Sequence, residues 1–211
     1  MKIDLTSPES SLFSSGVVGW RLDEEAPRLL ALCREAGIPC DDLLDKPVKR
    51  QREKAAERLL LCQAFGRPVT LLHTEQGAPL VEGIDVNISI SHTQQMVVLA
   101  WSEDHIIGID AEQADRRQVI KVRDKFLNDK EKQFISPDDL AAHIIAWTAK
   151  EAMIKVTRNS AVNWTDDICL EPFTAGEVET RLFAWCDGRR YTLATRVLLG
   201  HYVTIAEPCL K

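Results

Sequence analysis

Residues 86–110, VNISISHTQQMVVLAWSEDHIIGID, hold three β-strand patterns that are separated by short polar turns. Apolar and polar side chains alternate over residues 86–91, which is typical of a strand with one buried face. Residues 96–101 are almost entirely apolar, as in a strand that is buried on both faces. A third strand is expected over residues 106–110, so the middle of the chain is predicted to form a sheet.

Helical patterns precede these strands. Residues 26–32 are mostly apolar, acidic residues come just before them and Gly37 follows, which matches the capping preferences of helices. Pro47 is expected to open a second helix that ends near Gly66, because proline suits the first turn of a helix and glycine suits its end. We therefore expect a largely helical first quarter, followed by a strand over residues 69–73.

The second half follows a similar plan. A helix is expected over residues 118–126, and a longer one is expected to begin at Ser136, because serine is a preferred N-cap residue. Asp187-Gly188 predicts a hairpin turn. Short strands are expected to close the chain near Ile168, Leu182, Leu193 and Val203.

Helices and strands thus occur in both halves without the regular alternation that a parallel sheet requires. This pattern predicts an α+β fold of two similar α/β halves, residues 1–105 and 106–211, with mainly antiparallel sheets and packed helices. No linker or low-complexity tract separates the halves. We therefore expect them to form one compact unit.

Composition narrows the range of functions. The 211 residues are 45% hydrophobic and 27% charged, which is ordinary for a globular protein. No apolar run approaches the ~20 residues needed to cross a bilayer, and the N-terminus lacks a secretory pattern, so we expect a cytoplasmic protein without a membrane partner. The net charge of −6 argues against a nucleic-acid partner, although it permits a local basic pocket. The six cysteines contain no zinc-site spacing.

Two carboxylates mark the end of the third strand. Asp110 and Glu112 are two residues apart, so a strand would direct both toward one side. Paired hard oxygen ligands suit Mg²⁺, which prefers carboxylates, waters and substrate phosphates. The alternative is a strand that runs out into an acidic surface turn.

A second candidate lies within the long helix. Trp147, Glu151 and Lys155 are spaced by four residues and share roughly one face, with Lys150 on its flank. Glu151 could supply a third metal ligand, and the lysines could lie near phosphate oxygens. The alternative is a surface helix with an ion pair between residues 151 and 155.

His92 is the third candidate. It stands between hydroxyl-bearing residues at the end of a strand and could donate hydrogen bonds to a phosphate. The alternative is a histidine in a polar turn. The other histidines, which have no comparable neighbours, are read as structural or surface residues: His73, His105, His143 and His201.

Together and in this order, these segments resemble the signature of the 4′-phosphopantetheinyl transferase superfamily. The matching segments are Ser91-His92-Thr93, Gly108-Ile109-Asp110-Ala111-Glu112 and the Trp-x-x-Lys-Glu-Ala-x-x-Lys run from Trp147 to Lys155. The likeness is strongest over residues 77–156 and is greatest to the larger single-chain branch. Members of that branch resemble two fused copies of a smaller subunit, so the resemblance implies a pseudo-dimer of the two halves.

The resemblance implies transfer of 4′-phosphopantetheine from coenzyme A to a serine of an acyl or peptidyl carrier protein, with release of adenosine 3′,5′-bisphosphate. It implies that Asp110, Glu112 and Glu151 bind Mg²⁺, and that Glu151 and Lys155 are catalytic. It further implies that coenzyme A is contacted by His92, Lys150 and Lys155, and by a cation of the basic segment over residues 46–58, for which Arg52 is the preferred candidate.

Some positions depart from the family pattern. Ala78 replaces the lysine of a frequent Gly-Lys-Pro segment, Ser89 replaces an asparagine, and the glycine-rich turn expected after the helix is absent at residues 156–160. A relative that binds a carrier protein or coenzyme A without catalysis is therefore an alternative. A Mg²⁺-dependent phosphohydrolase is another, whereas a serine hydrolase is disfavoured because no Gly-x-Ser-x-Gly motif occurs.

Overall fold

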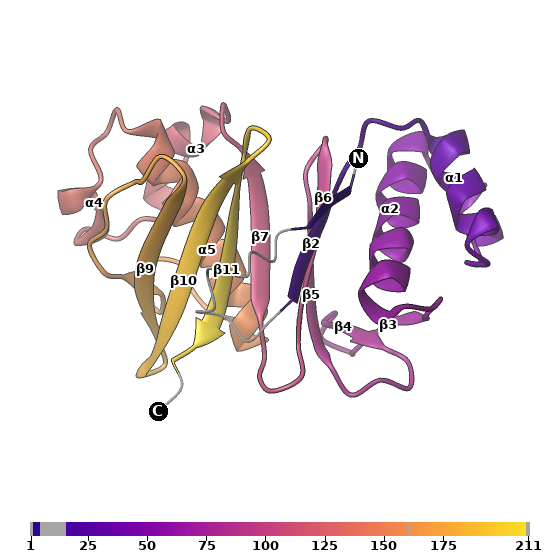
Figure 1. Ribbon diagram of the computed structural model, residues 1–211. Helices are drawn as coiled ribbons and strands as arrows, with labels where there is room; N and C mark the ends of the chain where they lie inside the picture. The colour runs from indigo at the N-terminus through magenta and orange to yellow at the C-terminus, as the bar shows by residue number, and fades with distance from the viewer. Residues whose placement is uncertain (1, 5–15, 160, 210–211) are drawn as a thin grey trace. The chain divides into compact units, whose positions relative to one another are not determined.

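The computed structural model describes residues 2–4, 16–159 and 161–209. The chain divides into two compact units, Met1–Asp104 and His105–Lys211. Each unit combines helices with an antiparallel sheet, which confirms the predicted α+β fold (Figure 1). The pseudo-dimer relation between the halves stays a prediction. Within the described ranges, no helix has both the length and the apolar character that a membrane crossing requires.

The first unit is built on a four-stranded sheet with the order β1-β2-β6-β5. These strands are β1 (Lys2–Asp4), β2 (Gly16–Arg21), β6 (Met96–Ser102) and β5 (Asn87–His92), and all neighbours pair antiparallel. The short strands β3 (Leu71–His73) and β4 (Pro79–Val81) form a separate hairpin. The predicted strands over residues 86–91 and 96–101 are confirmed as β5 and β6.

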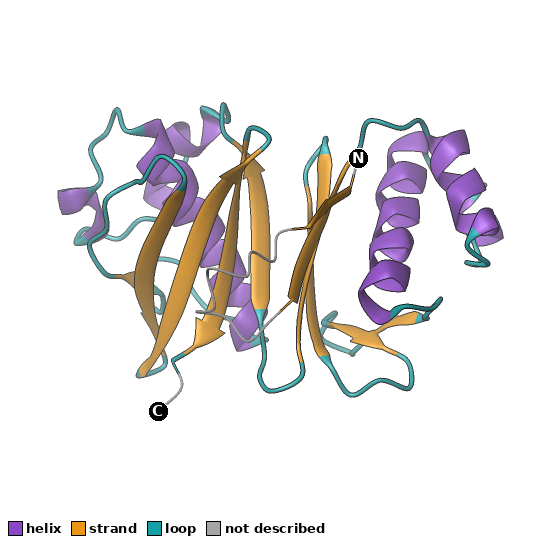
Figure 2. Cartoon of the chain, viewed as in Figure 1, coloured by secondary structure: helices purple, strands orange, loops and turns teal. Residues whose placement is uncertain are grey.

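Two helices cover one face of this sheet (Figure 2). Helix α2 (Val48–Phe65) packs against β2 and β6, and α1 (Ala26–Glu35) packs against α2, with the 3₁₀ turn η1 (Asp41–Leu43) between them. As predicted, Pro47 precedes α2 and Gly66 ends it, with a left-handed φ of 68°. The core between these layers is apolar and includes Leu29, Leu60 and Leu99.

The first quarter is less helical than predicted, because Gly16–Arg21 form strand β2. This strand was not predicted from the sequence. Its residues, GVVGWR, include glycines that weaken a local strand pattern. Gly16 is required by packing, since a Cβ atom there would lie 2.0 Å from the ring of Trp101 in β6. A contact with a strand about 85 residues away cannot be read from the local sequence.

The second unit is built on a five-stranded antiparallel sheet with the order β7-β11-β10-β9-β8. Its strands are β7 (Gly108–Gln113), β8 (Cys169–Leu170), β9 (Glu179–Cys186), β10 (Arg189–Leu198) and β11 (His201–Pro208). Asp187 and Gly188 have φ values of 50° and 69°, which confirms the predicted hairpin turn. The four closing strands near their predicted positions are likewise present.

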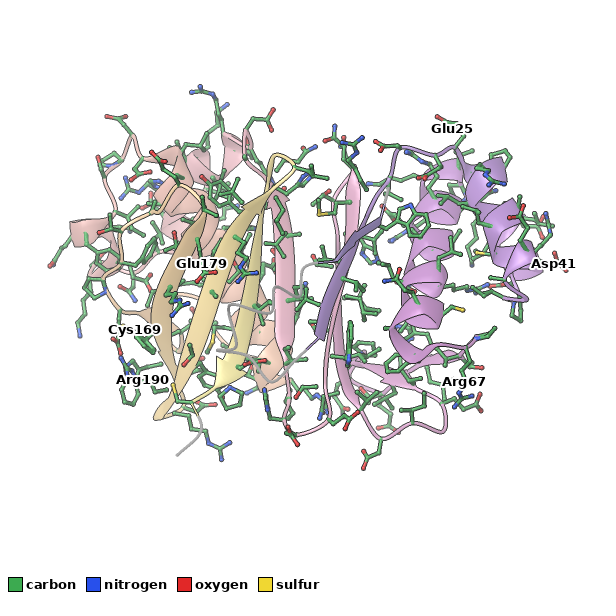
Figure 3. The ribbon with its side chains drawn as sticks, viewed as in Figure 1. Glu25, Asp41, Arg67, Cys169, Glu179 and Arg190 are labelled. Atoms are coloured by element: carbon green, nitrogen blue, oxygen red, sulfur yellow. The ribbon has the colours of Figure 1, made fainter. Side chains whose placement is uncertain are left out.

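The outer face of β9 and β10 carries charged side chains, including Glu179 and Arg190 (Figure 3). Glu179 accepts hydrogen bonds from Arg181 and Arg196, each at 2.7 Å. Exposed pairs of this kind contribute little to stability. The core of the unit lies on the other side of the sheet, under the long helix.

Helix α5 (Leu140–Thr157) packs against β7 and β11. Its contact with β7 is close, because a Cβ atom on Gly108 would lie 2.0 Å from the backbone oxygen of Ala152. The prediction that Ser136 is the N-cap of this helix is wrong. The cap is Asp139, whose carboxylate accepts a hydrogen bond from the backbone N–H of Ala142 at 2.9 Å, while the backbone oxygen of Ser136 accepts one from Asp139 in a separate turn.

The helix predicted over residues 118–126 is interrupted. It consists of α3 (Gln118–Lys121) and the 3₁₀ turn η2 (Arg123–Lys125), and the chain leaves helical geometry at Val122. The break lets the next residue, Phe126, enter the core with 0% exposure. A short helix that was not predicted, α4 (Glu131–Phe134), follows.

Candidate functional site

The carboxylates predicted to bind metal lie on the edge strand β7. Asp110 and Glu112 are two residues apart in a regular strand that pairs with β11, so their side chains point to the same face. Both residues are largely buried, with 7% and 9% exposure. Largely buried carboxylates need partners, and each has a cation beside it.

Lys155 is the partner of Asp110. Its Nζ donates hydrogen bonds to Oδ1 of Asp110 at 2.9 Å and to the backbone oxygen of Ile109 at 2.7 Å. Lys155 reaches β7 because α5 packs directly on that strand, at the glycine that permits the close approach. The structure therefore brings these two predicted site residues together.

Glu151 lies one turn before Lys155 in α5, beside the same acidic strand. Burial raises the pKa of the Glu151 carboxyl, and the charge of Asp110 raises it further, while Lys155 and Arg116 partly offset both effects. The effect of Asp110 on the pKa of Glu151 is consistent with carboxyl groups in the same neighbourhood. Three of the predicted residues, Asp110, Glu151 and Lys155, thus share one location.

Glu112 has a partner that we did not predict, Arg116. The two side chains form an ion pair, and the guanidinium of Arg116 lies over the ring of Trp147, 5.5 Å from its centroid. Trp147 itself packs against Phe126 and Trp164. The spacing of four residues between Glu112 and Arg116 did not predict this pair, because β7 ends between them and such spacing brings side chains together only on a helix.

The donor set fits a hard divalent cation in its chemistry. Carboxylate oxygens are the ligands that Mg²⁺ prefers, and the repulsion between Asp110 and Glu151 is what a cation would relieve. As the side chains lie, Asp110 and Glu112 face Lys155 and Arg116, and the described ranges contain no three-ligand cluster of metal-binding side chains. The Mg²⁺ site stays a prediction.

Lys150, which we expected to contact coenzyme A, lies in the core with 0% exposure. Its three ammonium hydrogens have acceptors in Glu131 Oε2 at 2.7 Å and in the backbone oxygens of Trp164 at 2.7 Å and Ile168 at 3.1 Å. Burial lowers the pKa of Lys150, and Glu131 only partly opposes this. One residue along a helix turns the side chain by about 100°, so Lys150 points away from the acidic strand and ties α5 to the core.

In the first unit, His92 ends strand β5 and contacts helix α2. Its Nε2 lies 3.1 Å from Oε2 of Glu57, and the Nζ of Lys54 lies 2.9 Å from each oxygen of the same carboxylate. The side chain of Glu57 is only 4% exposed, whereas that of His92 is 26% exposed. His92 therefore combines a buried anionic partner with an accessible edge.

Arg52, the preferred cation of the basic segment, has a structural role. Its guanidinium donates hydrogen bonds to the backbone oxygens of Leu22 and Glu24 and so joins α2 to the chain before α1. The basic residues that face open space are different ones. They line a cavity of about 750 Å³ within the first unit together with Glu57: Lys46, Arg50, Lys54 and Arg58. Arg50, Lys54 and Arg58 are spaced by four residues, which places them on one face of α2, and Lys46 lies just before the helix. This spacing was the sequence signal that we missed.

Comparison with known proteins supports the reading of the second unit. A family model described as the 4′-phosphopantetheinyl transferase superfamily matches residues 106–203, a stretch that contains Asp110, Glu112, Glu151 and Lys155. No curated protein matches the chain. The match does not distinguish the larger single-chain branch from others. Residues 106–203, a little under half of the chain, therefore match the 4′-phosphopantetheinyl transferase superfamily, the family that the sequence motifs resemble.

Proposed function

We propose that the chain transfers the 4′-phosphopantetheinyl group of coenzyme A to a serine side chain of an acyl or peptidyl carrier protein. One observation carries the proposal most directly: Asp110, Glu151 and Lys155 lie together where β7 packs on α5, within the stretch that matches the family. Phosphoryl transfer asks a protein mainly for positioning and for neutralisation of charge. Two carboxylates and an ammonium group can supply both.

We assign Asp110, Glu112 and Glu151 to hold Mg²⁺ beside the pyrophosphate of coenzyme A. When bound, the ion would neutralise the charge that develops on the pyrophosphate as its bond breaks. For this, Glu112 must leave its ion pair with Arg116. The 41% exposure of the Arg116 side chain favours that exchange, because the freed guanidinium can be hydrated, while the cation would replace Arg116 as the partner of the buried Glu112 carboxylate.

Lys155 is assigned to the leaving group. Asp110 and Ile109 accept two of its hydrogen bonds, and an ammonium group has three hydrogens. The third hydrogen can be donated to the oxygen that bridges the two phosphates of coenzyme A. Positive charge at that oxygen stabilises adenosine 3′,5′-bisphosphate as it departs.

Glu151 is assigned as the proton acceptor. The serine oxygen forms a bond to the phosphorus nearest the pantetheine, the bond from that phosphorus to the bridging oxygen breaks, and the serine proton passes to Glu151. Glu151 suits this role because its carboxylate lies in the neighbourhood of Asp110 and Lys155, where the serine would attack.

The first unit is assigned to the 3′-phosphate of coenzyme A. His92 has an accessible edge, and Arg50 and Lys54 face the cavity beside α2. Arg50 replaces Arg52 in this proposal, because the guanidinium of Arg52 is bound to backbone oxygens. Phosphate groups favour such cationic donors.

The experiment follows the release of adenosine 3′,5′-bisphosphate from coenzyme A in Mg²⁺, with and without an apo carrier protein. We expect that adenosine 3′,5′-bisphosphate is released only when the carrier is present, and that one molecule is released for each carrier molecule modified. Release without any carrier would instead indicate a phosphohydrolase. No release with a panel of fatty-acid, polyketide and peptide carriers would favour the non-catalytic relative.

A further inference from the structure

Glu57 is a buried carboxylate to which the transfer chemistry gives no role. It lies on α2 with its side chain 4% exposed, and its two oxygens accept from Lys54 and contact His92. Burial alone would raise the pKa of Glu57, but the hydrogen bond from His92 and the charge of Lys54 outweigh it and hold the pKa below its ordinary value. Glu57 is therefore an anion that faces one nitrogen of the His92 ring.

This contact decides which nitrogen of His92 is available to a ligand. A carboxylate only accepts hydrogen bonds, so the nitrogen 3.1 Å from Glu57, Nε2, carries a hydrogen. The hydrogen bond made by one ring nitrogen fixes the state and direction of the other. Nδ1 is left to face a ligand, and it can donate to a phosphate oxygen only when it also carries a hydrogen.

We propose that Glu57 is a positioning residue, which holds the His92 ring by Nε2 and directs Nδ1 toward the 3′-phosphate of coenzyme A. The inference rests on the proposed function, because it takes the ligand of His92 to be that phosphate. Lys54 assists by keeping the carboxylate of Glu57 ionised and in place. Although Glu57 lines the cavity beside α2, we assign it no contact with the cofactor, because two anions repel each other.

Glu53 provides a matched control on the same helix. It lies about one turn before Glu57, its side chain is 6% exposed, and it pairs with Arg50 at 3.0 Å and with Lys49 at 3.8 Å. It thus shares the burial and the basic neighbours of Glu57. The difference is that the ion pairs of Glu53 connect it to helix residues, and those of Glu57 extend to His92.

The test compares the binding of coenzyme A with that of 3′-dephospho-coenzyme A by calorimetry. The wild-type protein is expected to prefer coenzyme A, and Glu57→Gln is expected to reduce this preference about tenfold, the loss of one charge-assisted hydrogen bond. His92→Ala should reduce it at least as much, and the double variant should lose no more than His92→Ala. Glu53→Gln, which releases Arg50 from its ion pair but leaves His92 and its partner intact, should not reduce the preference. A general loss of folding would weaken the binding of both ligands and leave the ratio of their affinities unchanged.

Some outcomes contradict the inference alone. If the wild-type protein transfers phosphopantetheine and His92→Ala loses the preference, but Glu57→Gln keeps it, Glu57 does not position His92 and the proposed function stands. If the wild-type protein neither binds coenzyme A nor modifies a carrier, both proposals fail. Should Glu57→Gln not fold, Glu57→Asp, which keeps the charge but shortens its reach, is expected to lose the preference in the same direction.

A second measurement needs no variant. Long-range proton–nitrogen spectra of the wild-type protein with coenzyme A bound should show hydrogens on both ring nitrogens of His92. An unprotonated Nδ1 in that complex would overturn the inference, because such a nitrogen cannot donate to a phosphate.

Discussion

Lys155 in α5 donates a hydrogen bond from Nζ to Oδ1 of Asp110 in β7 over 2.9 Å, with the backbone oxygen of Ile109 as a second acceptor. The contact joins a helix residue to a strand residue 45 positions earlier in the chain, at the point where Gly108 permits close packing. It fixes the ammonium group beside the carboxylates that we assign to Mg²⁺.

Lys155→Met should lower the rate of carrier modification by about 100-fold to 1000-fold, because one donor to the developing charge of the leaving group is lost. Rates of adenosine 3′,5′-bisphosphate release measure this. Because Asp110 is largely buried and loses its cation, the variant should also be less stable, so rates are compared at equal concentrations of folded protein. A variant with normal kcat would remove Lys155 from the mechanism.

Glu151→Gln should reduce kcat by at least about 100-fold, because the amide can neither take the serine proton nor bind Mg²⁺ as a carboxylate does. Single-turnover rates with a saturating carrier measure the chemical step. Near-normal turnover of this variant is the result that would rule out Glu151 as the proton acceptor.

Lys150→Met should destabilise the protein by about 3–5 kcal/mol, because it leaves the buried carboxylate of Glu131 without its cation. Denaturant unfolding measures the loss. The double variant Lys150→Met/Glu131→Gln should be more stable than Lys150→Met alone, since the uncompensated charge is then removed. If the single variant were as stable as the wild-type protein, the buried pair would not have the structural role that we give it.

Glu57 should make folding stability depend on pH in the acid range. Its pKa is lowered by folding from an ordinary value of 4.5, so the unfolded chain binds more protons between the two values and stability rises with pH there. The contribution of Glu57 is therefore present above pH 4.5 and is lost as the pH falls through the folded pKa. Unfolding of the wild-type protein and of Glu57→Gln, compared across this range, should show a difference in stability that shrinks toward acid. A difference that does not change with pH would contradict the assignment.

The elements that the sequence predicted well are those with local signals. The apolar pattern of β6, the proline and glycine that bound α2, and the Asp187-Gly188 turn all depend on a few adjacent residues. Strand β2 was not predicted, because Gly16 is placed there for a long-range contact with Trp101 and not for a local strand pattern. The N-cap of α5 was misplaced because Ser136 and Asp139 are both good capping residues, and packing selects the second.

The site residues also divide into those that local spacing predicted and those that depend on long-range packing. Spacing along one strand and one helix predicted that Asp110, Glu151 and Lys155 could act together; Lys155 does contact Asp110, and the shared role of the three stays a prediction. Spacing could not reveal that Lys150 turns into the core toward Glu131, which is 19 residues away in sequence. Nor could it choose Arg50 over Arg52, because that choice depends on which helix face meets the backbone before α1.

The most direct test of the account is the mass of an apo carrier protein after incubation with this chain and coenzyme A, in Mg²⁺ and, in parallel, in excess chelator. We predict a gain of one phosphopantetheine group in Mg²⁺ and no gain in chelator. An unchanged mass in Mg²⁺ for every class of carrier would contradict transfer, and an equal gain in chelator would contradict the assignment of Asp110, Glu112 and Glu151 to a metal ion.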